Sequence, residues 1–195
     1  MLKKILKTFM VVIMLSGLTA CVSESRQLFP DVTFTHLPGI QMAVSDITIE
    51  QRYKSPMTAE YADHRIPLSP QTVMTRWPGD RISQTGGEAR AKFIIMDASV
   101  KEYGLDIDGN FTAYFTDEQA LRYEATAEAM FQISSNDGNT HGKVRARVKR
   151  SVTVPENASL NERDKILFDW TAALTREFDV QMEQEIRKYL GAWLP

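Results

Sequence analysis

The sequence predicts an α+β domain: an antiparallel sheet of about four strands, with a short helix and a long C-terminal amphipathic helix packed on one face. Two patterns carry this prediction. Between Leu121 and Val154, apolar and polar residues alternate in two runs separated by a turn, as in strands with one wet face. From Ser159 onward, apolar residues recur at spacings near 3.6, as on a helix with one buried side.

The first strand is predicted over residues 42–53. It follows the chain breaker Pro38-Gly39 and contains Val44, Ile47 and Ile49, which are typical strand residues. The stretch 54–69 holds two prolines and shows neither a helical nor an alternating period. This stretch is therefore expected to be a loop.

A short helix and a central strand are expected next. Ser69 before Pro70 predicts a helix start, because proline is tolerated at the first helical position. Pro78-Gly79 is expected to end or kink this helix. Within residues 91–103, the run 93–96 is apolar on both faces. Such a run is typical of a strand covered on two sides, which predicts the centre of the sheet.

The alternating runs predict a β-hairpin. Residues 121–133 place apolar side chains at odd positions, and residues 144–154 place them at even positions. The sequence Asn136-Asp137-Gly138-Asn139 between them is a strong turn signal. We therefore expect two long antiparallel neighbours in the sheet.

The C-terminal helix is predicted from a capping box, Ser159 with Glu162, in which each side chain satisfies a free backbone donor. One apolar stripe follows, formed by Leu160, Leu167, Trp170, Leu174, Phe178, Met182, Ile186 and Leu190. Gly191 is expected to end the helix. The stripe needs a buried partner, and the apolar face of the sheet is the one available.

The N-terminus has the three-part plan of an export signal. Three lysines within the first seven residues precede the apolar run 9–15, and residues 16–20 are small or neutral. The apolar run is far shorter than the roughly 20 residues that span a bilayer core. Residues 1–20 are therefore expected to be a signal peptide that is removed.

The end of this signal, Leu18-Thr19-Ala20-Cys21, resembles the lipobox of bacterial lipoproteins. The alternative is an ordinary signal peptide with a chance cysteine at its end. The resemblance implies that Cys21 is acylated and becomes the first residue of the mature chain. Val22 stands where an aspartate would imply retention in the inner membrane, so the resemblance implies the outer membrane, with the chain facing the periplasm. Residues 21–40 are expected to be the lipidated tether and residues 41–195 a single domain.

Composition limits the classes of function. Without residues 1–20, which hold three lysines and no acid, 20 Lys and Arg face 25 acids, a net charge of −5. A domain that binds nucleic acid needs a concentrated basic surface, so this class is excluded. Cys21 is the sole cysteine, so an acylated chain has no disulfide. No cofactor motif is found, neither a P-loop nor a dinucleotide fingerprint.

Candidate partner-binding residues lie in the stretch 53–67, which begins at the end of the first strand and continues into the expected loop: Tyr53, Met57, Tyr61 and His64. Aromatic and methionine side chains are favoured in interface cores, and loops carry a large share of functional residues. Asp63-His64 beside Tyr61 is also the one local cluster with acid–base potential. The loop is therefore the first candidate for a protein contact.

The second candidate is a basic face on the later hairpin strand, formed by Lys143, Arg145, Arg147 and Lys149. These cations could bind the phosphate groups of lipid or lipopolysaccharide. The alternative is that they pair with Glu124 and Glu128 across the hairpin, because opposite charges on neighbouring strands are mildly stabilising. We expect mainly the pairing.

Metal and enzyme chemistry is weakly supported. Asp106, Asp108, Asn110 and Asp117 resemble calcium ligands in spacing, but Gly109 is misplaced for an EF-hand, which favours a plain turn. His36, His64 and His141 form no metal motif. No G-x-S-x-G elbow or S-x-x-K pair marks a nucleophile. We expect no metal and no catalytic residue.

The order of elements on a short lipid tether is similar to small outer-membrane lipoproteins that serve as auxiliary components of transport systems. The resemblance implies a non-catalytic adaptor with an envelope protein partner. The rival hypothesis is a lipid or lipopolysaccharide binder, which uses the basic strand or a cavity lined by Trp170 and Phe178, where a solid core is otherwise expected. An unrecognised enzyme is the third hypothesis.

Overall fold

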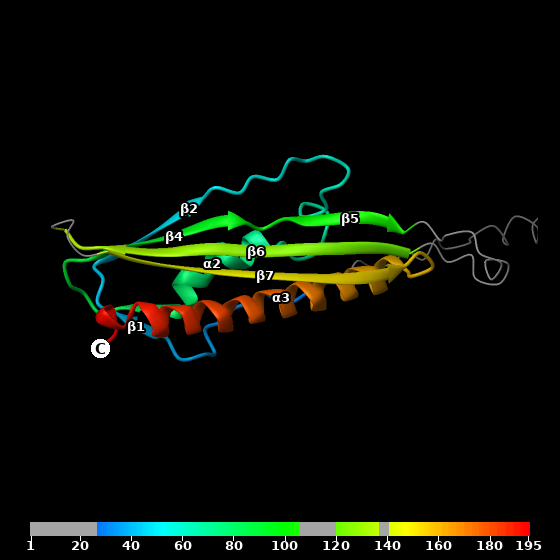
Figure 1. The fold of residues 1–195 in the computed structure, drawn as a ribbon. Coiled ribbons are helices and arrows are strands. Elements are labelled where there is room, and N and C mark those ends of the chain that lie inside the picture. The colour runs from blue at the N-terminus through cyan, green and yellow to red at the C-terminus, as the bar shows by residue number, and fades with distance from the viewer. Residues whose placement is uncertain (1–26, 106–119, 137–140) are drawn as a thin grey trace, which may run out of the picture.

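The computed structural model describes residues 27–105, 120–136 and 141–195. The predicted signal, Cys21 and the four residues with calcium-like spacing lie outside these ranges. The predicted fold class is confirmed: an α+β domain has a curled sheet with a short and a long helix on one face (Figure 1).

The main sheet has five strands and is mixed, where about four antiparallel strands were predicted. Its members are β2 (Asp46–Gln51), β4 (Arg90–Asp97), β5 (Val100–Leu105), β6 (Ala120–Ser134) and β7 (His141–Pro155). β2 runs parallel to β4, and the other pairs are antiparallel. The parallel pair arises because the chain between β2 and β4 crosses back through a helix, which a hairpin cannot do.

β4 and β5 follow one another along the same edge of β6. The register of β4 against β6 shifts between Ile95 and Asp97, so the strand predicted over 91–103 is broken in two. β4 has a strand on each side, as predicted for the apolar run 93–96, and its outward-facing Ile94 is buried.

The predicted first strand is also divided. β1 (Ile40–Met42) pairs in parallel with β3 (Ile82–Gln84), and β2 begins after Ser45. Ser45 donates its backbone N–H to the carbonyl of Ala89 at 2.8 Å. This turn moves the chain from the small sheet to the large one.

The short helix α2 (Pro70–Arg81) starts where predicted, with Ser69 as its N-cap, but it does not end at Pro78. Proline removes one backbone donor and strains a helix interior. Here Trp77, Pro78 and Arg81 are all buried, and their packing offsets the lost hydrogen bond.

The hairpin is confirmed. β6 and β7 pair over their full length, with Ala127 opposite Val148 and Ser134 opposite His141. The odd side chains of β6 and most even ones of β7 face the helices and are buried. The remaining side chains of these two strands are mostly polar. They lie on the face of the sheet opposite the helices, which is called the outer face below.

The long helix α3 (Leu160–Tyr189) carries the predicted capping box and is followed by a 3-10 turn, η2 (Gly191–Trp193). It packs on β7, β6 and α2. The predicted stripe is buried except for Leu160, whose side chain is 72% exposed because it lies in the first turn, beyond the sheet. Trp170 and Phe178 belong to the solid core.

The packed part of the chain begins before the boundary expected at residue 41. Gln27 donates its backbone N–H to the Asn161 side chain at 3.3 Å, and the ring of Phe29 stacks on Phe168 with 4.7 Å between centroids. Phe34 is buried in the core. The N-terminal segment is thus fixed to the start of α3. Within the described ranges, no helix is both long and apolar enough to span a bilayer.

Candidate functional site

The segment 53–67, which lies mostly within the predicted loop 54–69, runs along the free edge of β5. Ala62 donates its N–H to the carbonyl of Val100 at 2.8 Å, and Glu102 donates to the carbonyl of Glu60 at 2.8 Å. Tyr61 lies opposite Lys101 in this short antiparallel bridge. The segment therefore continues the sheet beside β5, where β2 no longer reaches.

Side chains hold the same segment in place. The Lys101 ammonium lies 2.7 Å from a Glu60 carboxylate oxygen and 5.0 Å from the centre of the Tyr61 ring. The hydrogen bond to Glu60 raises the pKa of Lys101. Arg65 lies 3.6 Å from Glu102 and donates to the carbonyl of Ala59 at 2.8 Å. These contacts fix the conformation of the segment between residues 59 and 65.

Of the four candidate residues of this segment, two have half-buried side chains and two have exposed side chains. Tyr53 and Tyr61 are half-buried, and the Tyr53 hydroxyl donates to the buried carboxylate of Asp63 at 3.3 Å. Burial and the neighbouring Asp63 raise the pKa of Tyr53. Met57 is 65% exposed at a positive φ of 58°, and His64 is exposed. Asp63 thus holds Tyr53 at the buried side of the segment, while His64 is accessible from solvent.

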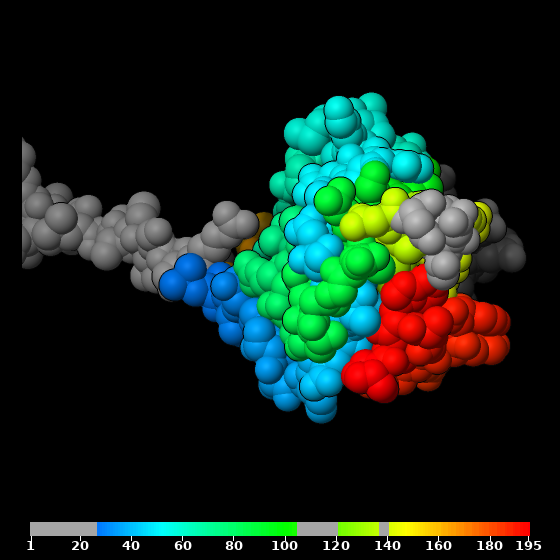
Figure 2. Space-filling model, turned by 90° about the vertical axis from the view of Figure 1, so that its left-hand side faces the viewer, coloured from blue at the N-terminus to red at the C-terminus, as the bar shows by residue number. Residues whose placement is uncertain are grey.

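In space, the segment 53–67 stands on the side of the domain opposite α3. Figure 1 shows it above the sheet with α3 below, and Figure 2 shows it as a projection at the top of the molecule, far from the red end of α3. The segment and the C-terminal end of α3 therefore lie on different sides of the domain.

The predicted basic face lies on the outer face of the sheet, and its charges are partly paired. Arg145 and Arg147 both contact Glu128, whose carboxylate is nearly buried; Arg147 Nε lies 3.1 Å from it. Lys143 and Lys149 have no ion-pair partner among the described residues. The pairing expected with Glu128 is thus confirmed for the two arginines.

The pairing expected with Glu124 is wrong. Glu124 pairs with Arg122 on its own strand at 2.8 Å, because the residue opposite it on β7 is Ser151, which carries no charge. One carboxylate, Glu128, therefore faces two arginines of β7.

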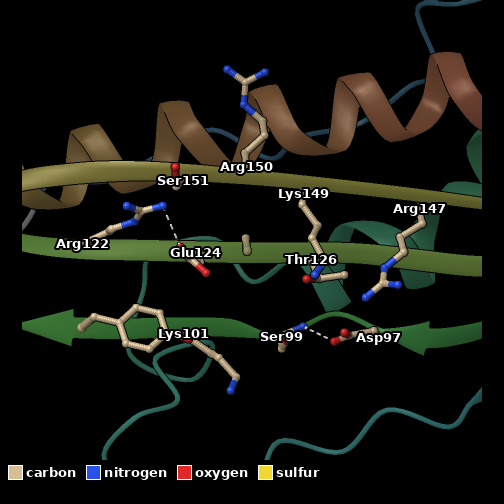
Figure 3. Close-up of a pocket in the computed structure, with 12 residues that line it drawn as sticks. Asp97, Ser99, Lys101, Arg122, Glu124, Thr126, Arg147, Lys149, Arg150 and Ser151 are labelled. Atoms are coloured by element: carbon tan, nitrogen blue, oxygen red, sulfur yellow. Dashed lines mark hydrogen bonds and ion pairs between the residues drawn. The ribbon is translucent and has the colours of Figure 1, made fainter.

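A shallow trough of about 430 Å³ crosses the outer face where β4 breaks into β5 (Figure 3). Its lining includes the short side chains of Ser99 and Thr126, which lie between the charged residues of its walls (Figure 3). Its charged lining consists of Lys101, Arg122, Arg147, Lys149, Arg150, Asp97 and Glu124. Lys101, Arg122, Arg147 and Arg150 are each ion-paired, with Glu60, Glu124, Glu128 and Glu177 respectively, so Lys149 is the trough cation without an ion pair among the described residues.

The break in the strand shapes this trough. Ser99 donates its N–H to the Asp97 carboxylate at 3.0 Å and accepts from the N–H of Thr126 at 2.9 Å. This irregular step moves β5 relative to β4 and leaves only short side chains between Lys101 and Lys149. β-bulges commonly re-aim side chains in this way.

Some of the residues that line this trough could be predicted from the sequence patterns. Arg147 and Lys149 were identified, and the alternation of β6 also places Arg122 on the wet face. Lys101 could not be assigned to this face, because the break at Asp97 changes which side chains point outward. His36, His64 and His141 are all exposed and far apart in sequence, and no metal-binding cluster is found within the described parts of the chain.

No protein-family model matches the chain, and no curated protein matches it. Among solved structures, a minor lipoprotein from Acinetobacter baumannii is similar at a TM-score of 0.34 and 12% sequence identity. The match covers 76% of this chain and 96% of that one. A likeness of this size identifies no family and carries no argument about function.

Proposed function

We propose that this protein is a lipid-anchored, non-catalytic adaptor, held by Cys21 at the periplasmic face of the outer membrane, that binds another envelope protein through the segment 53–67. The anchor is supported by the lipobox, and the choice of membrane by Val22.

The anchor and the domain are close together. Gln27 is already bound to α3, and six residue steps separate it from Cys21. At about 3.3–3.6 Å per residue, a fully extended chain spans roughly 20 Å over that distance. The domain is therefore held near the membrane surface, in reach of proteins embedded in or resting on that membrane.

The observation that best supports the adaptor function is the exposure of the Met57 side chain to solvent. This methionine is exposed two residues before the stretch 59–65, which backbone pairing with β5 and contacts with Lys101, Tyr53 and Arg65 hold in place. A flexible loop would lose conformational entropy on binding, and a fixed one loses less. Methionine also adapts to irregular apolar surfaces. An exposed methionine beside a fixed stretch of chain therefore favours a protein-binding contact over a loop that is exposed only to solvent.

The test is affinity purification of the tagged, lipidated protein after crosslinking in intact cells, with bound proteins and extractable lipids identified by mass spectrometry. We expect a near-stoichiometric envelope protein with the wild-type chain. Its capture should fall at least tenfold with Met57→Ser. The matched control is Val180→Ser, a similarly exposed apolar residue on α3, which should leave capture unchanged. Equal capture by all three chains would contradict the assignment of the segment.

The anchor is tested separately. In cells grown with labelled palmitate, the wild-type protein should carry the label and sediment with outer-membrane fractions. The Cys21→Ser variant should carry no label. An unlabelled wild-type chain cut at an ordinary signal-peptidase site would contradict the anchor.

A further inference from the structure

The trough on the outer face lies at the anchored end of the domain. β5 ends and β6 begins at the end where α3 starts (Figure 1). Arg122 and Thr126 lie two and six residues into β6, or roughly 7–20 Å from its end at about 3.4 Å per residue. Gln27, the residue nearest to the anchor, is bound at the same end, to Asn161 in the first turn of α3. The trough is therefore within reach of the surface to which Cys21 attaches.

Lys149 and Arg147 are the trough cations whose charge is least neutralised, whereas Lys101 and Arg150 are paired with Glu60 and Glu177 outside the trough. Glu128 serves both Arg145 and Arg147, and Lys149 has no ion-pair partner in the described part of the chain. Arg122 is paired with Glu124 at 2.8 Å. In Figure 3, Lys149 reaches across Thr126 and Arg147 extends beside it, both from β7 over the trough.

The remaining acid is on the opposite wall. Asp97 lies on β4 and already accepts the N–H of Ser99 at 3.0 Å. An anion would therefore bind on the β7 side, between Lys149 and Arg147, above the hydroxyls of Thr126 and Ser99. Guanidinium, ammonium and hydroxyl donors around a small open trough are the groups that bind phosphate oxygens in proteins.

We propose that this trough binds a phosphate group, and that the phosphate belongs to the headgroup of an anionic phospholipid. The phosphate site stands on Lys149, Arg147 and the hydroxyls of Thr126 and Ser99 alone. The choice of a lipid as its source rests on the proposed anchoring through Cys21. The proposed phosphate donors Lys149 and Arg147 lie on β7, whereas Lys101 of the same trough contacts Glu60 and Tyr61 of the segment 53–67.

Native mass spectrometry of the full lipidated chain in non-ionic detergent tests the site. Short-chain phosphatidylglycerol, short-chain phosphatidylcholine and soluble glycerol 3-phosphate are the probes. We expect saturable binding of one phosphatidylglycerol and at least tenfold weaker binding of the zwitterionic phosphatidylcholine. Lys149→Gln should weaken phosphatidylglycerol binding at least tenfold.

Lys143→Gln is the matched control. Lys143 lies on the same strand and the same face as Lys149, is likewise exposed and without an ion pair among the described residues, but does not line the trough. We expect its removal to change the affinity less than twofold. Equal weakening by the two variants would overturn the site, because binding would then depend on charge in general. Unchanged binding by Lys149→Gln would overturn it as well.

The probes distinguish the sources of phosphate. Binding of glycerol 3-phosphate without the lipid would support the phosphate site and overturn the phospholipid as its source. The mass of the purified chain reports acylation of Cys21 independently, so loss of the proposed anchor and loss of the trough site give different results.

Discussion

Arg81 and Asp179 form an ion pair in the interior, with 2.6 Å between Nε and Oδ1 and both side chains almost fully buried. Trp77 Nε1 donates to the same carboxylate oxygen at 2.8 Å. The guanidinium also donates to the carbonyl of Pro38 and to Glu183. One buried arginine thus joins α2, α3 and the N-terminal segment.

Removal of one partner should be strongly destabilising. Asp179→Ala removes the buried carboxylate that pairs with Arg81, leaves the half-buried Glu183 as its remaining acidic partner, and leaves Trp77 Nε1 without its acceptor. Breaking such a buried pair costs about 3–5 kcal/mol, which we expect as a fall in the free energy of unfolding measured with urea. The control is Glu177→Ala, whose partner is the exposed Arg150; exposed pairs contribute under about 1 kcal/mol. Similar losses for both variants would contradict this role of Asp179.

The start of β7 touches the C-terminal residues. A Cβ added at Gly142 would lie 2.6 Å from Leu190 Cδ2 and 2.8 Å from Trp193 Cζ3. Gly142→Ala should therefore lower stability by about 1–3 kcal/mol, as overpacking does, and speed hydrogen exchange around Trp193. Gly191→Ala meets no atom within 4 Å and is the control. A neutral Gly142→Ala would show that the C-terminal turn is not packed there.

Stability should fall at high pH. Burial, with a hydrogen bond to Glu102, raises the pKa of Tyr123 to about 12, from about 10 for an unfolded tyrosine. The folded state therefore favours neutral Tyr123, and this contribution is complete below pH 10 and is lost as the pH rises toward 12. Urea unfolding between pH 9 and 11 should show a smaller decline for Tyr123→Phe. Tyr189→Phe, at an exposed site, should leave the decline unchanged.

Local sequence patterns were sufficient to predict the helices and strands that bury one continuous face. The alternation along β6 and β7 gave their pairing, and the capping box Ser159 with Glu162 gave the start of α3. In both cases, neighbouring residues along the chain carry the signal. The outward position of the basic residues of β7 could be predicted for the same reason.

The structural features that the sequence did not predict depend on contacts between residues distant in sequence. The parallel pairing of β2 with β4 has no local pattern, and the break at Asp97 is set by the packing of β5 against β6. Of the two outcomes expected at Pro78, an end of the helix is not seen, because the last turn of α2 is buried against the rest of the domain. Burial of Arg81 depends on Asp179, 98 positions away, and no local pattern marks either residue.

The most direct test of the adaptor function is site-specific photo-crosslinking in living cells, with a photoreactive amino acid at position 57 in one strain and at position 180 in another. We expect position 57 to form one discrete, ultraviolet-dependent adduct with a single envelope protein. Position 180 should form none with that protein. Absence of an adduct at position 57, or the same adduct from both positions, would contradict a partner bound at the segment 53–67.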